Sequence, residues 1–421
     1  MKRAFLKLSA AACAVLIAGP ALASSPIELI VDYPFPELFR DVHTEIASEF
    51  MARNPNIKIT FRAPTPGYEE ATQQTLRQAV TKQLPDIAFH GLNRQRIFSD
   101  RDLAVDLQPF IRKEANWARM GYDQALLSLG QVGGRQTGLG FALSTPIVFV
   151  NNDLLKRAGV SLQGMTGSWD SVIAAARKVR EASPGSNGIH VEWDITGNWM
   201  WQTLVFSNGG RMLSSDEKTV EVDSPAGQQA IRTLGRLVDE AGMKNLSPSN
   251  AVQDFASGNL AMLVTSTARL GQLNRMSAGK FEIKTAPMPI AANGRLPAGG
   301  KVAMMFTRDP QRQAAAWEYI KFATGPVGAT IMVRRTGYFP GNNIPANDAA
   351  MLKTFYEQNP NHLTAIRQLP IMTAWYAFPG ENGLKITEVM KDHLQTVVLR
   401  EVAPTDALKT MTRDVRALLP R

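Results

Sequence analysis

Cysteine and histidine are scarce in this sequence of 421 residues. The single cysteine, Cys13, lies close to the amino terminus, so the rest of the chain offers no disulfide and no thiolate ligand. The five histidines form no H-x-H or H-x-x-x-H pair, the spacings typical of zinc ligands on one strand or one helix face. We therefore expect no metal site and no cofactor.

Motifs of common catalytic sites are also missing. There is no G-x-S-x-G elbow and no G-x-x-x-x-G-K-[ST] loop, and Gly138-Leu139-Gly140 lacks the third glycine of a dinucleotide fingerprint. Residues 215–218 match S-x-x-K in letters only, because we expect them on a hairpin tip instead of a helix start. The sequence thus favours a binding protein over an enzyme.

Long runs of one charge are absent, although basic residues are in excess. Lys and Arg number 46 against 37 Asp and Glu, a formal net charge of +9, and three of the basic residues lie within the first seven positions. Scattered charges of this kind are typical of a solvated surface and not of a nucleic-acid-binding face. We expect no nucleic-acid partner.

No apolar run reaches the roughly 20 residues that span a bilayer. Residues 1–23 combine a basic start, a short apolar stretch and the ending Ala21-Leu22-Ala23, which together predict a secretory signal peptide cleaved after Ala23. A membrane anchor is the alternative. Lipid attachment at Cys13 is disfavoured because Ala10 stands where a branched apolar residue is needed. We expect a protein exported to the periplasm.

The chain after this segment alternates β-rich runs with amphipathic helical patterns. Residues 27–31, 57–61 and 86–89 predict strands, and residues 38–50 and 72–84 predict the helices between them. This β-α-β-α-β order is one half of a doubly wound domain. It indicates an α/β fold with mostly parallel sheets.

The remaining chain continues the alternation and is too long for one hydrophobic core. A second apolar block covers residues 141–150, a helix follows Trp169-Asp170, and another runs through 231–241 and closes at Gly242. Residues 209–213 and 219–222 predict a small hairpin. We see no repeat and no flexible linker, so two domains would be joined by short chain crossings.

Two groups of aromatic residues stand out. Trp193, Trp199 and Trp201 cluster in one segment, and residues 375–380 read Trp-Tyr-Ala-Phe-Pro-Gly. Flat aromatic faces cover the C–H side of sugar rings, while nearby amides and hydroxyls bond their OH groups. Core packing is the alternative for each of these residues. Proline and glycine in the second group favour a loop at a cleft.

Four segments in order resemble a known family. Residues 143–159, followed by Ser168-Trp169-Asp170, resemble its strand–Asn-x-Asp–helix–Ala-Gly…Ser/Thr-Trp pattern. Residues 255–262 are similar to F-x-x-G-x-x-A-M, residues 314–322 to A-A-x-x-F-I-K-F, and residues 336–340 to T-G-Y-x-P. The family is that of bacterial extracellular solute-binding proteins of ABC importers, in the class of maltodextrin- and glycerol-3-phosphate-binding proteins.

The resemblance implies a two-lobed periplasmic binding protein fold. Each lobe would be a mostly parallel sheet flanked by helices, with a ligand cleft between the lobes. We expect residues 24–142 plus 288–337 in lobe 1 and residues 143–287 plus 338–421 in lobe 2. By analogy, the hinge crossings lie near residues 141–143, 285–287 and 337–339.

The resemblance also implies a function. The expected protein is a monomeric receptor that captures a carbohydrate, polyol or glycerol-phosphate-type ligand and delivers it to an inner-membrane ABC permease. Two alternatives remain open at this point. One is a secreted carbohydrate-active enzyme, for which Glu192 and Asp194 are the available acid pair. The other is a binding protein for a peptide, polyamine or metal, which cleft carboxylates around a cation would support.

The expected ligand-binding residues combine the aromatic groups with positions that match the family's motifs. They are Tyr33, Tyr68, His90, Ser144, Trp199, Trp201, Ser266, Arg269, Gly299, Gly300, Tyr338, Trp375, Tyr376 and Phe378. Members of the glycerol-3-phosphate class also use a late arginine. Residues 378–383 contain none, the nearest cation is Lys385, and Arg269 is the candidate substitute. This departure puts a glycerol phosphate ligand in doubt, because a compact dianion normally requires a paired cation.

Overall fold

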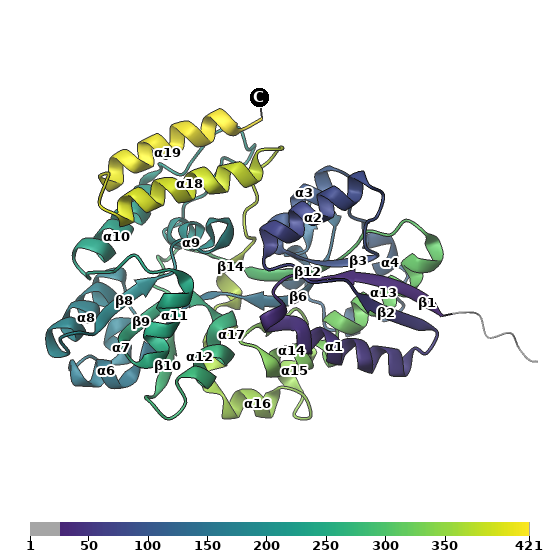
Figure 1. Ribbon diagram of the computed structural model, residues 1–421, viewed down its shortest axis with the longest axis horizontal. Helices are drawn as coiled ribbons and strands as arrows, with labels where there is room; N and C mark the ends of the chain where they lie inside the picture. The colour runs from purple at the N-terminus through teal and green to yellow at the C-terminus, as the bar shows by residue number, and fades with distance from the viewer. Residues whose placement is uncertain (1–25, 421) are drawn as a thin grey trace, which may run out of the picture.

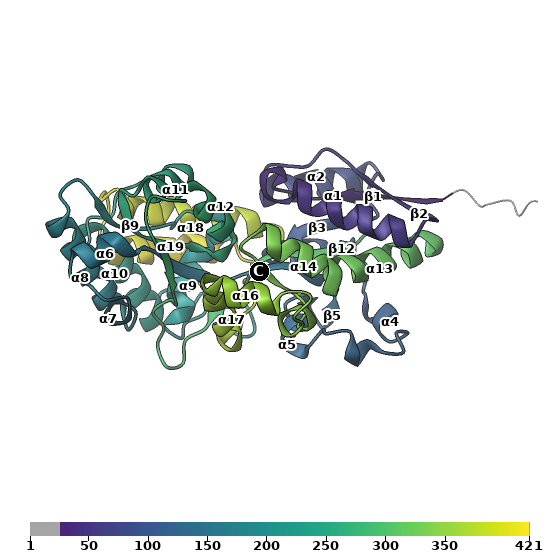
Figure 2. The same cartoon turned by 90° about the horizontal axis from the view of Figure 1, so that it is seen from below.

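The computed structural model describes residues 26–420, which form two lobes side by side (Figure 1, Figure 2). The predicted signal peptide lies outside the described residues. Within residues 26–420, no helix combines the length and apolarity needed to cross a membrane.

The first lobe is built on a six-stranded sheet. Its strand order is β13-β6-β12-β3-β1-β2. Helices α1 (Pro36–Arg53), α13 (Pro310–Thr324) and α14 (Pro326–Arg335) pack on one face, and α2 (Tyr68–Val80) contacts β3. The strands are β1 (Ile27–Asp32), β2 (Ile57–Phe61), β3 (Ile87–Gly91), β6 (Leu139–Ser144), β12 (Gly299–Met305) and β13 (Phe339–Pro340).

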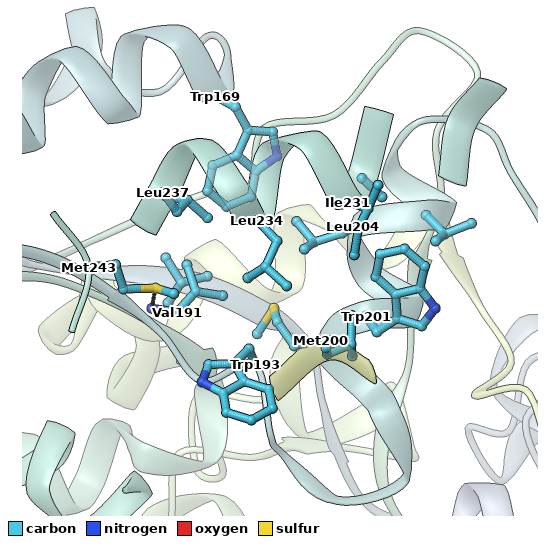
Figure 3. Close-up of a cluster of buried hydrophobic side chains, with 14 of the residues drawn as sticks. Trp169, Val191, Trp193, Met200, Trp201, Leu204, Ile231, Leu234, Leu237 and Met243 are labelled. Atoms are coloured by element: carbon cyan, nitrogen blue, oxygen red, sulfur yellow. Dashed lines mark hydrogen bonds between the residues drawn. The ribbon is translucent and has the colours of Figure 1, made fainter. Parts of the chain in front are cut away.

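The second lobe is built on a four-stranded sheet of order β10-β7-β9-β8. Its strands are β7 (Pro146–Asn151), β8 (Asn187–Val191), β9 (Leu260–Ser266) and β10 (Ile283–Ala286). Apolar side chains of the sheet and of several helices form one buried core, part of which Figure 3 shows. The helices are α8 (Trp169–Ala182), α9 (Trp199–Ser207), α10 (Pro225–Asp239), α11 (Pro248–Ser257), α18 (Gly383–Val398) and α19 (Pro404–Leu418).

The expected α/β alternation is confirmed, but the expectation of mostly parallel sheets is wrong. β1 is parallel to β2 and β3, and β8 is parallel to β9, whereas the other five pairings in the two sheets are antiparallel. β7 and β12, which follow passages into a lobe, run opposite to the main strands of their sheets, whereas β6 runs in the same direction as β1 and β3. A strand that arrives from the neighbouring lobe runs opposite to strands that end at the cleft.

The predicted bounds of strands match the structure more closely than the predicted ends of helices do. The strand predicted at 27–31 is β1, and the helix predicted at 72–84 is α2, which begins and ends four residues earlier. The early start follows extended Gly67, and the acidic first turn of Glu69 and Glu70 favours a helix amino terminus. The predicted hairpin is present in a short form: an antiparallel bridge joins Leu213 to Val220, and the Ser214 and Glu221 N–H groups bond the Thr219 and Met212 carbonyls.

The chain passes between the sheets at three places. β6 ends at Ser144 and β7 begins at Pro146, so the first passage is at Thr145. The second lies between β10 and β12 and includes β11 (Leu296–Pro297), which pairs with β14 (Met372–Thr373) on the third passage.

The segment before β14 stays with the first lobe. β13 pairs with β6, and Leu352 and Tyr356 pack in the core of the six-stranded sheet. The expected limits placed residues 338–421 in lobe 2. The chain can stay with the first sheet for longer because β14, and not β13, forms the last passage.

Candidate functional site

The strand ends that face each other between the lobes form a cleft. The carboxyl end of β6 at Ser144 pairs with the amino end of β12 at Gly299, and Ser266 at the end of β9 pairs with Pro146. Glu192 directly follows β8, which is parallel to β9. Antiparallel pairing therefore places two chain passages and several polar side chains at one position. The resulting cavity has a volume of about 270 Å³.

Nine residues predicted from the sequence line this cleft, and they come from both lobes. Tyr68 lies on α2 of the first lobe, whereas Trp199 begins α9 of the second. The nine are Tyr68, Ser144, Trp199, Ser266, Arg269, Gly299, Gly300, Tyr338 and Trp375. Contact with a ligand remains a prediction for each of them.

Aromatic rings form one wall of the cleft. The rings of Tyr68 and Trp375 meet edge to face with centroids 6.2 Å apart, and Trp199 lies 6.0 Å from Trp375. Both indole N–H groups donate to backbone carbonyls, from Trp375 to Gly197 at 3.3 Å and from Trp199 to Pro297 at 3.1 Å. These bonds fix the ring orientations before a ligand arrives, which reduces the entropy cost of binding.

Two tyrosine hydroxyl groups add polar atoms to this wall. Burial raises the pKa of Tyr338 to about 12. It also raises the pKa of Tyr68 well above its usual value, with a further contribution from Tyr338 and Glu69. Both phenols are therefore neutral at physiological pH. The Tyr68 hydroxyl is buried, with the Tyr338 hydroxyl as its polar neighbour.

Carboxylates outnumber cations in the cleft. Its lining includes Glu37, Glu69, Glu192 and Asp194, with Arg269 as the one cation among the lining residues described. Arg269 was predicted from the sequence as a ligand-binding residue, Glu192 and Asp194 only as the acid pair of an enzyme, and Glu37 and Glu69 were not predicted. Glu69 adjoins the predicted Tyr68, and Glu37 follows the Pro-Phe-Pro stop of the first strand, so both stood next to recognised signals.

Two of the carboxylates have strong partners. Glu69 forms an ion pair with buried Arg94 and accepts a hydrogen bond from the Thr196 hydroxyl, which belongs to the opposite lobe. Glu192 accepts a hydrogen bond from Thr265 and lies 3.4 Å from the Arg269 guanidinium. These contacts neutralise both charges and leave the Arg269 charge largely committed to Glu192.

The other two carboxylates are less satisfied. Asp194 has a buried oxygen, Oδ1, without a hydrogen-bond partner among the described residues. Burial and the neighbouring Glu192 charge both raise the pKa of Asp194. The exposed Glu37 has no side-chain hydrogen bond or ion pair within residues 26–420.

Close packing of the surrounding chain requires glycine at positions 299 and 300. A Cβ at Gly299 would lie 2.6 Å from the Ser144 Oγ and 2.8 Å from the Trp199 ring. Gly300 has a φ of 108° and faces the Ala142 carbonyl, so only glycine fits there. The two residues lie immediately before a register shift between β12 and β6. They let two strands and a tryptophan meet at the cleft.

Tyr33 and His90 lie elsewhere in the first lobe. They line a separate, narrow cavity of about 10 Å³. The Tyr33 ring packs 4.3 Å from His43, and His90 Nε2 lies 3.1 Å from the Thr75 hydroxyl. Burial lowers the pKa of His90 to about 3. Both side chains extend from strands or strand ends into the lobe's core, away from the cleft.

Trp201, Phe378 and Tyr376 are also outside the cleft. Trp201 and Phe378 are in the core of the second lobe, where Figure 3 shows Trp201 with Leu204 and Ile231. Tyr376 lies beyond Trp375, and its hydroxyl donates to Glu217 at 2.9 Å. Tyr376 lines a neighbouring cavity, which Trp375 also borders, and does not line the cleft.

No group of three or more potential His, Cys, Asp or Glu ligands that could hold a metal ion occurs in the part of the chain that the structure describes. The cleft offers hydrogen-bonding groups, charges and aromatic faces. Such a site can recognise an organic solute.

Several solved structures share this architecture. UgpB from Mycobacterium tuberculosis, in complex with glycerophosphocholine, has a TM-score of 0.80 at 20% identity and covers 94% of this chain and 98% of that one. The cyclic alpha-maltosyl-1,6-maltose binding protein from Arthrobacter globiformis has a TM-score of 0.77 at 20% identity. The match covers 94% of this chain and 99% of that protein. These likenesses confirm the α/β periplasmic binding protein fold.

Sequence comparison leads to the same family. The sn-glycerol-3-phosphate-binding periplasmic protein UgpB of Escherichia coli K12 is 23% identical over 298 residues, 67% of this chain and 66% of that relative. The match thus spans just under two thirds of the curated relative. Residues 36–330 match the family described as bacterial extracellular solute-binding protein. The match covers more than half of the chain, which therefore belongs to the family of bacterial extracellular solute-binding proteins.

Proposed function

We propose that this protein is an exported receptor that captures a carbohydrate, polyol or glycerophosphate-type solute between its lobes and delivers it to an ABC permease. The observation that carries the proposal is the cleft itself, lined from both lobes by aromatic faces and hydrogen-bonding groups. The receptor binds its solute without making or breaking bonds. In this proposal the signal peptide is removed after Ala23 and the protein acts as a periplasmic monomer.

Closure of the lobes follows from the position of the cleft. A solute that touches Tyr68 on one lobe and Ser266 on the other binds the closed state more tightly than the open state and therefore favours it. Shifting the closed fraction from about 1% to 99% requires roughly 5.5 kcal/mol of differential binding. A few hydrogen bonds and stacked rings that join both lobes are sufficient. The lobe limits given from the sequence, with residues 24–142 and 288–337 in lobe 1, are part of this proposal, with lobe 1 extended past residue 337 to include β13 and Tyr356.

Related proteins support the ligand class. The Escherichia coli relative is named for sn-glycerol 3-phosphate, and the similar structures were solved with glycerophosphocholine or named for a cyclic maltosyl-maltose. Within the cleft, carboxylates and hydroxyls suit the OH groups of a sugar or polyol. A bare phosphate dianion fits less well, because Arg269 is already beside Glu192.

A thermal-shift screen tests the proposal. The panel comprises glucose, maltose, glycerol, glycerol 3-phosphate and glycerophosphodiesters, each at millimolar concentration. A solute at 100 times its dissociation constant adds about 2.7 kcal/mol to the free energy of unfolding, so the melting temperature should rise with at least one compound. No rise with any compound would overturn the proposed ligand class.

A further inference from the structure

Phe35 has a backbone conformation that is rare for a bulky residue. It lies between β1 and α1, where its φ of 61° and ψ of 65° are in the left-handed region. Steric contacts of the Cβ disfavour this region, and a residue that precedes a proline, as Phe35 precedes Pro36, is normally extended. Such a conformation persists only where the surrounding contacts enforce it, and strained residues of this kind gather at functional sites.

Hydrogen bonds fix the peptide groups on both sides of Phe35. The Pro34 carbonyl accepts a hydrogen bond from Lys301 Nζ at 3.1 Å, and the Phe35 N–H donates to the Thr65 carbonyl at 2.9 Å. Because these two bonds hold opposite edges of the Pro34–Phe35 peptide plane, they restrain φ of Phe35. The Phe35 carbonyl accepts two N–H groups from the first turn of α1, which restrains ψ.

The donor of the first bond is a fully buried lysine on β12. Lys301 Nζ lies 3.3 Å from the centre of the Phe39 ring and 5.6 Å from that of Phe35, and the charge of Glu37 acts on it from the cleft lining. Burial of an amine costs free energy, and an apolar side chain fills a core position at a lower cost. Packing alone therefore does not explain a lysine here, whereas the bond to the Pro34 carbonyl does.

The ring that this arrangement holds lines the cleft. The Phe35 and Tyr68 rings meet edge to face, with centroids 4.9 Å apart, and Phe35 thereby extends the aromatic wall of Tyr68 and Trp375. A change of φ from 61° to the extended region would rotate the Phe35 side chain about the fixed peptide and away from Tyr68. Phe35 is not among the ligand-binding residues predicted from the sequence.

We infer that Lys301 is a positioning residue of the cleft, which holds the Pro34–Phe35 peptide so that the Phe35 ring contacts the solute. This inference rests on the proposed function and adds a binding residue together with its support. Aromatic faces cover the C–H side of a sugar or polyol. Lys301 does not line the cavity, so its effect on binding passes through Phe35.

Two substitutions of Phe35 separate the ring from its backbone. In isothermal titrations with glucose, maltose, glycerol 3-phosphate and glycerophosphocholine, Phe35→Ala and Phe35→Gly should each weaken binding at least fivefold, because both remove the ring. Phe35→Gly should nevertheless unfold at a higher urea concentration than Phe35→Ala, since glycine adopts a φ of 61° without strain. Phe110→Ala is the control, because it removes a half-buried ring of the same lobe outside the cleft, and it should leave affinity unchanged.

A double-mutant cycle tests the role of Lys301. Lys301→Met removes the amine and keeps an apolar side chain, and it should weaken binding at least threefold. In the Phe35→Gly background the same substitution should change affinity less than twofold, because the ring that Lys301 positions is already absent. A lysine with only a structural role would weaken binding equally in both backgrounds. Lys301→Leu repeats the cycle if Lys301→Met does not fold.

The outcomes separate this inference from the proposed function. Unchanged affinity in Phe35→Ala, equal effects of Lys301→Met in both backgrounds, or a higher urea midpoint for Phe35→Ala than for Phe35→Gly would overturn the inference while the proposed function stands. Absence of binding by every compound of the thermal-shift panel would instead overturn the proposed function and the inference with it.

Discussion

The Arg96 guanidinium on the first lobe donates two hydrogen bonds to the Glu217 carboxylate on the second, 2.5 and 2.7 Å long. The Tyr376 hydroxyl donates to the same carboxylate at 2.9 Å. None of these three residues lines the cleft. The ion pair therefore joins the lobes independently of ligand and stabilises the arrangement of the lobes in this structure.

Glu217→Gln should weaken this connection between the lobes. Bidentate pairing with a charged partner is lost, and the pair is partly exposed, so about 1 kcal/mol of closed-state stability should disappear. Ligand affinity should fall about fivefold, because a smaller fraction of the free protein is closed. The dissociation constant of a compound found in the thermal-shift screen measures the effect.

A matched control is Asp239→Asn, which breaks the exposed Arg400–Asp239 pair within the second lobe. This variant should leave affinity unchanged. Equal losses of affinity in the two variants would contradict a specific role for the Arg96–Glu217 pair between lobes.

Two tryptophans separate ligand binding from folding. Trp375→Ala should weaken ligand binding by at least about 1 kcal/mol, because a ring of the cleft wall is removed. Trp201→Ala should instead lower the free energy of unfolding by about 3–5 kcal/mol and leave the affinity of the folded fraction unchanged, because Trp201 is in the core. Titration and urea unfolding of both variants measure the two effects.

Asp194→Asn should raise the stability of the ligand-free protein at pH 7. The pKa of Asp194 is raised by burial, so the folded state binds its proton more readily than the unfolded state, and ionisation at neutral pH costs stability. The gain should be below about 1 kcal/mol because the carboxyl group is partly exposed and screened. It should vanish below the ordinary pKa of 3.8. Urea unfolding at pH 7 and pH 3.5 checks this, and a lower stability of the variant at pH 7 would contradict it.

Lys301 should make stability depend on pH in the alkaline range. This side chain is fully buried on β12, donates to the Pro34 carbonyl at 3.1 Å and lies 3.3 Å from the centre of the Phe39 ring. Burial lowers its pKa well below the ordinary 10.5. The unfolded chain therefore binds more protons, and the contribution of Lys301 raises stability with pH by up to about 1.4 kcal/mol per pH unit until pH 10.5.

Unfolding of the native chain and of Lys301→Met at pH 7.5 and 9.5 isolates this contribution. The variant should show a smaller increase in unfolding free energy between the two pH values. Lys218→Met, which changes an exposed lysine, is the control and should follow the native chain. Identical pH dependence in all three proteins would show that Lys301 does not titrate in this way.

Solution scattering tests lobe closure directly. The radius of gyration should decrease on addition of a saturating concentration of a compound that raises the melting temperature, because the solute contacts both lobes. Glu217→Gln should need about fivefold more ligand for the same decrease, because a smaller fraction of the free protein is closed. Unchanged scattering curves at saturation would argue against a hinge.

The sequence by itself determined the alternation of strands and helices, because apolar periodicity is a local property that survives without tertiary contacts. The strand at 27–31 and the apolar block at 141–150 were visible in this way. The tertiary structure decided that this apolar block splits between two sheets after Ser144, and that their reversed strands meet at a cleft. Strand direction in a sheet depends on distant partners, which periodicity does not report.

The same distinction applies to the site. Trp199 and Trp201 are equally buried, at 1% exposure each, yet two positions along a helix lie on nearly opposite sides, so one reaches the cleft and the other the core. Hydrophobicity alone cannot separate them. Glu37 and Glu69 carry no signal in the sequence beyond that of surface acids, and only the approach of two lobes gives them a shared cavity. Their charges matter because closure removes the water that would otherwise solvate them.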